Sequence, residues 1–149
     1  MNSLDTNVLI YAINSGCVEH NSAKQLYEAM LREPTQWILS DQILFEFYRR
    51  LQNSKILERP LNQAEALRQI TFLREESGVQ HCAYETGFWR ELILGISSTP
   101  RKSTHIFDRV LAITLRRNGV KTFYTRNVGD FQEFGFASLV NPIDSHQSK

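Results

Sequence analysis

Two spacings of apolar residues alternate along the chain, one typical of helices and the other of buried strands. Apolar positions recur at helical spacing in segments that begin near residue 7 and then cover residues 18–32, 40–51, 61–77, 85–96, 104–118 and 130–134. Short apolar runs predict strands at residues 1–4, 37–39, 79–83, 120–125 and 136–140. Because helices separate successive strands, we expect parallel pairing through crossover connections. The pattern predicts a three-layer α/β/α sandwich with a mostly parallel central sheet of about five strands.

Two segments follow neither spacing. Residues 97–103 are polar, include a proline and carry the adjacent charges of Arg101 and Lys102, so we expect a mobile loop there. Residues 144–149 are expected to form a loose C-terminal tail. The sequence of 149 residues shows no repeat or internal linker, and we expect a single domain over residues 1–143.

Composition narrows the class of protein. The hydrophobic share of 42% and the charged share of 22% are those of an ordinary globular protein, and no apolar run approaches the roughly 20 residues of a membrane span. Asp5 and Asn7 lie where the apolar part of a secretory leader would be, so we expect a cytoplasmic protein. The net charge is +1, which means that a polyanionic partner would have to meet local basic clusters.

The residues that most often bind zinc are few and scattered. The chain has two cysteines, Cys17 and Cys82, which form no CxxC pair, and its four histidines show no spacing typical of zinc ligands. Cysteines without a disulfide pattern suit a reducing compartment. We therefore expect any metal site to use oxygen ligands.

Four acidic residues follow predicted strands or begin a predicted helix. Asp5 directly follows the first strand, Glu46 lies within two turns of the second, and Asp130 comes shortly after the fourth. Asp108 lies in the first turn of the helix at 104–118, where the helix dipole favours an anion. Three of these acids also have ordinary explanations, because Asp5 can cap a helix, the helix dipole alone can explain Asp108, and Glu46 can begin a solvated helix face.

Taken together, these four acids predict a metal site. The carboxyl ends of parallel strands meet at one edge of a sheet, which is where ligands bind. Converging carboxylates repel one another and raise their pKa values unless a cation is present. Carboxylate oxygens without histidine or thiolate select Mg²⁺ or Mn²⁺. A hydrated divalent ion in an acidic pocket suits phosphodiester cleavage, because it activates water and neutralises charge on phosphorus.

Several short motifs, taken in order, resemble those of a known family. They are Leu4–Ala12, Phe45-Glu46-Phe47, His105–Ala112, Thr125–Phe131 and Asn141-Pro142. Over essentially the whole chain, their order and spacing resemble the PIN-domain family, and within it the VapC-type toxins of bacterial toxin–antitoxin systems. The resemblance implies a parallel sheet with helices on both faces and an endoribonuclease that needs Mg²⁺ or Mn²⁺. It also implies frequent homodimerisation and inhibition by a small antitoxin protein.

The resemblance assigns roles to individual residues. The acidic positions of the family correspond to Asp5, Glu46, Asp108 and Asp130. Polar neighbours that often orient the site correspond to Thr6 and Asn127. Some relatives carry an acid in place of Asn127, so a second metal position has fewer ligands in this chain. We expect Asp5 and Asp108 to be the principal ligands, the other two acids to bind directly or through water, and a metal-activated water to attack the phosphate in line.

Basic residues near these acids in the sequence are candidates for contacts with RNA phosphates. They are Arg101, Lys102, Arg109 and Arg126. Each also fits a solvated helix face or helix end. His105 lies one turn before Asp108 and either acts on the substrate or simply begins the helix.

Other functions fit parts of the same pattern. A PIN module that binds RNA or protein without catalysis would share it, although the presence of all four acids argues against such a module. A phosphatase with Asp5 as phosphoryl acceptor would need a second aspartate two residues later, where the chain has Asn7. Phe88, Trp89 and Leu92 either offer a surface for an antitoxin helix or belong to the core.

Overall fold

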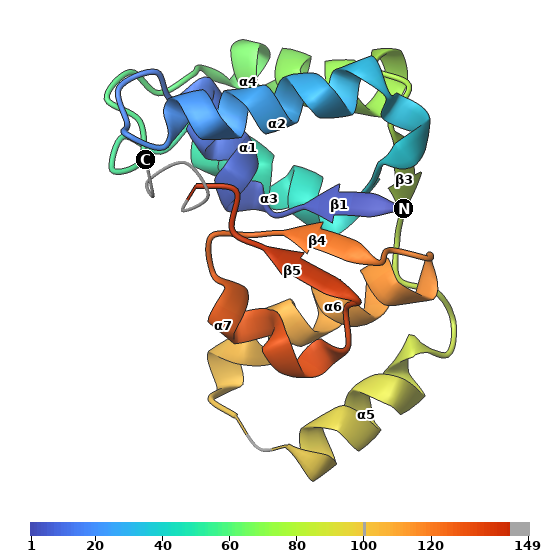
Figure 1. Ribbon diagram of the computed structural model, residues 1–149. Coiled ribbons are helices and arrows are strands. Elements are labelled where there is room, and N and C mark those ends of the chain that lie inside the picture. The colour runs from blue at the N-terminus through green and yellow to red at the C-terminus, as the bar shows by residue number, and fades with distance from the viewer. Residues whose placement is uncertain (100, 144–149) are drawn as a thin grey trace.

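Short parallel strands form the centre of the molecule (Figure 1). The structure is a computed structural model, and it describes residues 1–99 and 101–143. Position 100 of the predicted loop and the predicted tail at 144–149 lie outside the described residues. Within the described ranges the strands are β1 (Asn2–Leu4), β2 (Ile38–Ser40), β3 (Gln80–Cys82), β4 (Thr122–Tyr124) and β5 (Ser138–Val140).

The strands pair in two groups. β1, β4 and β5 form a three-stranded sheet in the order β1-β4-β5, and β2 pairs with β3. A parallel bridge between Asn2 and Trp37 connects β1 with the residue that precedes β2. The predicted sheet is thus divided into three and two strands, because β1 and β2 share only this bridge in the described chain. All the pairs are parallel, so the carboxyl ends of the strands lie at one edge.

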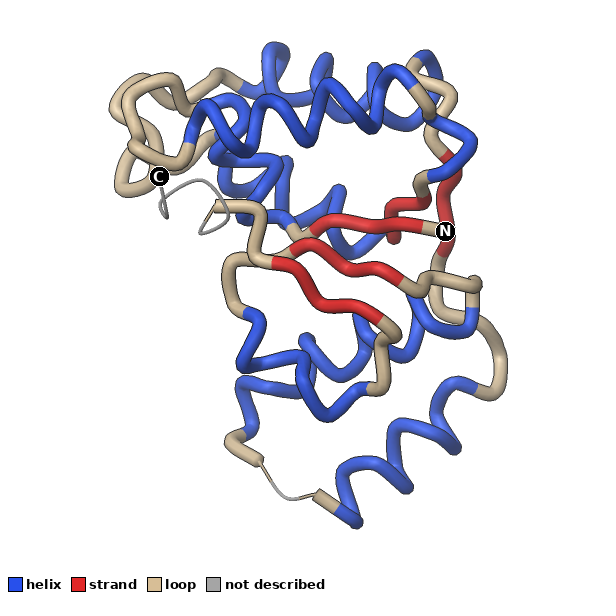
Figure 2. The backbone as a smooth tube through the Cα atoms, in the orientation of Figure 1, coloured by secondary structure: helices blue, strands red, loops and turns tan. Residues whose placement is uncertain are grey.

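Helices cover both faces of the strands. One layer contains α1 (Thr6–Ile13), α2 (His20–Arg32), α3 (Asp41–Leu51) and α4 (Gln63–Thr71). The other contains α5 (Phe88–Ser98), α6 (Ile106–Arg117) and α7 (Val128–Phe131). Shorter helical turns lie at Pro34–Gln36, Phe72–Glu76, Ser103–His105 and Gln132–Phe134. Figure 2 shows the strands between these two layers, which confirms the predicted α/β architecture.

Several helix ends follow signals that are visible in the sequence. Asp5 caps α1, and the Ser40 hydroxyl accepts a backbone N–H at the start of α3. Asn62 and Glu65 form a reciprocal capping box, which begins α4 two residues later than the apolar spacing predicts. Gly119 leaves α6 with φ +82°, as predicted.

Two predicted helices differ from the observed ones. The predicted helix at 61–77 is α4 followed by a π-helical turn, Phe72–Glu76, which a bond from the Ser77 N–H to the Phe72 carbonyl closes at 2.8 Å. α5 begins at Phe88, three residues later than predicted, and ends at Ser98, so it extends into the predicted loop. The hydroxyls of Ser97 and Ser98 bond to carbonyls four residues earlier in α5, so these polar groups are satisfied within the last turn of the helix.

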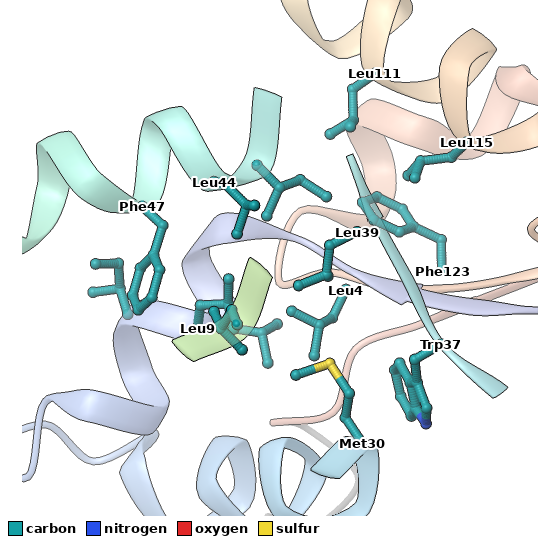
Figure 3. Close-up of a cluster of buried hydrophobic side chains, with 14 of the residues drawn as sticks. Leu4, Leu9, Met30, Trp37, Leu39, Leu44, Phe47, Leu111, Leu115 and Phe123 are labelled. Carbon is teal, nitrogen blue, oxygen red and sulfur yellow. The ribbon is translucent and has the colours of Figure 1, made fainter. Parts of the chain in front are cut away.

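The main core lies between the strands and both helical layers (Figure 3). Leu4, Leu39 and Phe123 are fully buried there, and each such side chain contributes about 1.5–3 kcal/mol to stability. A smaller core joins α5 to α6 and contains Phe88 and Leu92. No helix of the described chain is long and apolar enough to cross a membrane.

Candidate active site

Asp5 lies directly after β1 and caps α1, in a position that buries its carboxylate. The residue is 9% exposed. Its Oδ1 accepts the Thr6 N–H at 2.8 Å, and its Oδ2 accepts the Thr125 hydroxyl at 2.7 Å and the Asn7 amide at 3.4 Å. Burial raises the pKa of Asp5 from 3.8 to about 6, against the lowering effect of the bonds from Thr125 and Thr6. Asp5 is thus held in one orientation and is costly to ionise without a nearby cation.

Glu46 reaches the same edge from α3. Its Oε2 accepts the Thr6 hydroxyl at 3.1 Å, so Thr6 connects two of the predicted acids as a supporting residue. Its Oε1 accepts the Gln42 amide at 3.3 Å, and the same amide donates to the Phe107 carbonyl of α6 at 3.1 Å. Gln42 therefore joins the start of α3 to the start of α6, directly beside Asp108.

Asp108 and Asp130 approach from the opposite helical layer. Asp108 lies in the first turn of α6, with Oδ2 3.5 Å from Nδ1 of His105. Asp130 lies in α7, where its N–H donates to the Asn127 carbonyl at 3.0 Å. Burial raises the pKa of Asp108, the negative charge of Asp130 raises it further, Glu46 adds a smaller effect, and His105 lowers it.

These four acids form one electrostatic cluster. The charges of Glu46 and Asp108 both raise the pKa of Asp5. The charges of Asp130 and Glu46 both raise the pKa of Asp108. Asp5, Glu46 and Asp108 thus interact with one another, and Asp130 joins them through Asp108, across two helical layers and at the carboxyl edge of the strands.

The chemistry of this cluster fits a hard divalent cation. Its donors are carboxylate oxygens, and a cation between them would offset the burial and repulsion that raise the pKa values of Asp5 and Asp108. Within the described ranges, no three acidic, histidine or cysteine side chains are arranged to hold a single ion directly. Mg²⁺ commonly binds one or two carboxylates and keeps several waters, so it does not require three side-chain ligands around one ion.

Thr125 is a residue of the site that the acidic pattern did not reveal. It is fully buried, donates to Asp5, and accepts the N–H of Asn127 at 3.0 Å. Leu4 pairs with Tyr124 in the parallel register of β1 and β4. The residues that follow them, Asp5 and Thr125, therefore lie side by side. A correct strand pairing would therefore have identified Thr125 from the sequence.

The basic candidates differ in their surroundings. Arg101 Nε lies 2.8 Å from Oε1 of Glu133, and Arg109 Nη2 lies 3.6 Å from the same oxygen. Glu133 was not singled out by the sequence, yet it engages two of the four candidates. Lys102 is exposed, and Arg126 is half-buried.

The fold and the acidic edge agree with one family of proteins. The model of the PIN domain family matches residues 3–136. The chain therefore belongs to the PIN-domain family and, within it, to the VapC-type proteins. The predicted family is confirmed.

Named relatives are similar to the chain over nearly its whole length. Ribonuclease VapC24, found in two strains of Mycobacterium tuberculosis, is 35% identical over 147 residues, which cover 97% of this chain and 99% of that protein. The crystal structure of Mycobacterium tuberculosis VapC20, described as a sarcin-ricin loop cleaving toxin, matches with a TM-score of 0.68. It covers 91% of this chain and 96% of VapC20 at 18% identity, which shows that the two proteins share a fold.

Proposed function

We propose that the chain is a divalent-metal-dependent endoribonuclease that hydrolyses RNA phosphodiesters and acts as the toxin of a type II toxin–antitoxin pair. The observation that carries the proposal is the acidic cluster at the carboxyl edge of the strands, with its raised pKa values at Asp5 and Asp108. The similarity to a protein named ribonuclease VapC24 supports RNA as the substrate.

The acids of this chain have distinct parts in the proposed mechanism. A bound Mg²⁺ or Mn²⁺ would supply Lewis acidity and a lowered pKa for water. Asp5 and Asp108 are the proposed principal ligands, and the bonds from Thr6 and Thr125 hold the Asp5 carboxylate in one orientation. Glu46, which Thr6 and Gln42 hold, and Asp130 complete the negative charge, directly or through water.

We propose that basic residues beside this edge contact the RNA backbone. The side chain of Lys102 is exposed and lies in the segment between α5 and α6, three residues before His105. An exposed ammonium suits a phosphate contact, because its charge is available to the substrate. Arg126 follows Thr125, and its backbone N–H donates to Asn7 Oδ1 at 3.4 Å, which places it next to the acidic cluster.

RNA cleavage by the purified protein tests the proposed function. We expect cleavage of a mixed RNA substrate with Mg²⁺ or Mn²⁺, loss of cleavage with EDTA, and at least about a hundredfold loss in Asp5→Asn. Asp41→Asn is a matched control, because Asp41 also lies at the start of a helix but pairs with Arg74 at 3.8 Å. Cleavage that survives both EDTA and Asp5→Asn would contradict the proposal.

We also propose a small antitoxin protein as the partner and a homodimer as the state in the cytoplasm. A groove of about 660 Å³ between the start of α3, α5 and α6 is lined by Phe45, Trp89 and Phe107, which are 72%, 62% and 63% exposed. Exposed apolar surface of this kind supports binding of another protein. Size-exclusion chromatography of the chain, alone and with the product of the neighbouring reading frame, tests both proposals.

A further inference from the structure

Arg109 is a buried cation that follows Asp108 on α6. It is 7% exposed, and a buried charge is costly unless it is paired and hydrogen-bonded. Adjacent residues on a helix point about 100° apart, so Arg109 and Asp108 face different surroundings. The surroundings of Arg109 therefore need an explanation separate from the acidic cluster.

The guanidinium of Arg109 contacts the residue after α5 and the turn after α7. Nη2 donates to the Thr99 carbonyl at 3.0 Å, just after α5. The same nitrogen lies 3.6 Å from Oε1 of Glu133, and the guanidinium carbon lies 5.3 Å from the centre of the Phe134 ring. Glu133 and Phe134 belong to the turn that directly follows α7. Arg109 thus joins α6 to the end of α5 and to the segment that carries Asp130.

Gly95 makes this arrangement possible. A Cβ atom at position 95 would lie 2.7 Å from Nη1 of Arg109, which is closer than such atoms approach in proteins. Glycine is unfavourable by about 0.5–1 kcal/mol relative to alanine inside a helix, so its presence within α5 has a cost that this close approach explains. The guanidinium occupies the space that a side chain would take.

Arg101 extends the same network to the segment before α6. Its 2.8 Å contact with Glu133 ties the segment before α6 to the turn after α7. One carboxylate oxygen therefore holds two arginines, one exposed and one buried. Asp108 lies on α6 and Asp130 on α7, and this network joins the two helices near these acids.

We propose that Arg109 is a positioning residue that sets the separation of Asp108 and Asp130, and that the absence of a side chain at Gly95 leaves room for its guanidinium. The inference rests on the proposed metal-dependent function. A contact with RNA phosphate is a different role, and it would require the guanidinium to leave Thr99, Glu133 and Phe134.

Two substitutions disturb the network without changing the net charge. Arg109→Lys keeps the cation but loses the planar fork that meets three partners at once. Gly95→Ala keeps every charged residue and requires the end of the Arg109 side chain to shift. Ser97→Ala is the matched control, because Ser97 is exposed on the same helix and bonds within it.

Calorimetric titration with Mn²⁺, in the absence of RNA, measures the effect directly. We expect about tenfold weaker Mn²⁺ binding in Arg109→Lys and in Gly95→Ala, and unchanged binding in Ser97→Ala. The double variant should bind no more weakly than Arg109→Lys, because both changes act on one contact. Circular dichroism checks that each variant is folded at the temperature of the titration.

The outcomes separate the positioning role from the proposed function. Folded variants that bind Mn²⁺ with wild-type affinity would overturn the positioning role, and weaker RNA binding in those variants would show a substrate contact instead. A lower melting temperature with unchanged Mn²⁺ affinity would show that Arg109 is only structural. If the wild-type chain binds no Mn²⁺, the proposed function fails and the role of Arg109 with it. If Arg109→Lys does not fold, the Mn²⁺ affinity of Gly95→Ala alone tests the positioning role.

Discussion

The two halves of the acidic cluster are held in place by different means. Asp5 and Glu46, the inner pair, are oriented by side-chain and backbone donors at 2.7–3.4 Å, three of which come from Thr6 and Thr125. Asp108 and Asp130, the outer pair, take their positions from α6 and α7. The inner pair is therefore fixed residue by residue, whereas the outer pair is fixed by the packing of whole helices.

This difference teaches where the site is sensitive to change. A substitution next to the inner pair alters the charge and orientation of one carboxylate. A substitution that affects the outer pair can lie as far along the chain as Gly95, because it acts through the contacts between helices.

The largest expected effect concerns the ionisation of Asp5. The pKa of Asp5 rises from 3.8 to about 6 on folding, so the folded chain binds this proton more tightly than the unfolded chain. The stability that the proton contributes is complete below pH 3.8 and is lost as the pH rises through about 6. The difference corresponds to about 3 kcal/mol.

Asp5→Asn should therefore raise the melting temperature by about 6–12 °C at about pH 8 in metal-free buffer, with no gain at about pH 4. Added Mn²⁺ should stabilise the wild-type chain and not the variant. Differential scanning calorimetry measures both effects. An equal shift in melting temperature at the two pH values would show that ionisation of Asp5 does not destabilise the folded chain.

A smaller effect is expected from the hydroxyl that supports Asp5. Thr125→Val removes the 2.7 Å donor while keeping the shape of the side chain. The pKa of Asp5 should rise further, because the bond stabilises its ionised form. We expect about a tenfold lower cleavage rate near neutral pH and a pH profile displaced upward. Thr114→Val is the control, since Thr114 is also buried but bonds within α6. A profile identical to that of the wild type would refute the supporting role.

The smallest effect is expected at the outer pair, from His105. Its ring nitrogen lies 3.5 Å from Asp108 on a partly exposed surface, where ion pairs contribute about 0–1 kcal/mol. His105→Ala should therefore reduce cleavage less than about fivefold. A general acid or base would cost about a hundredfold or more, so rates measured with saturating metal distinguish the two roles.

The sequence was informative where one residue and its neighbours decide the structure. Asp5 follows a strand and caps a helix, and both facts are local. Gly119 ends α6 for a reason that involves only its own backbone. The family resemblance and the α/β fold rest on such local motifs in order, and both are confirmed.

Features that depend on distant partners could not be predicted in the same way. The phosphate role expected for Arg109 did not take account of Glu133 and Phe134, which lie far along the chain. Phe88 and Trp89 are adjacent, yet they are 4% and 62% exposed, because only packing against α6 decides which of them is buried. The division of the sheet likewise depends on how β1 and β2 diverge beyond one bridge.

Because the strands form two groups, the geometry of the acidic cluster depends on more than the stability of either sheet. Asp5 follows a strand of the three-stranded sheet, and Glu46 follows a strand of the two-stranded one. The bridge at Asn2 and Trp37 lies at the opposite ends of these strands from the acids. A local opening between β1 and β2 would break the bond from Thr6 to Glu46, disturb the shared core and separate these carboxylates, while the pairing within each sheet stayed intact. The free energy of global unfolding is thus only an upper limit for the free energy that is needed to separate the acids.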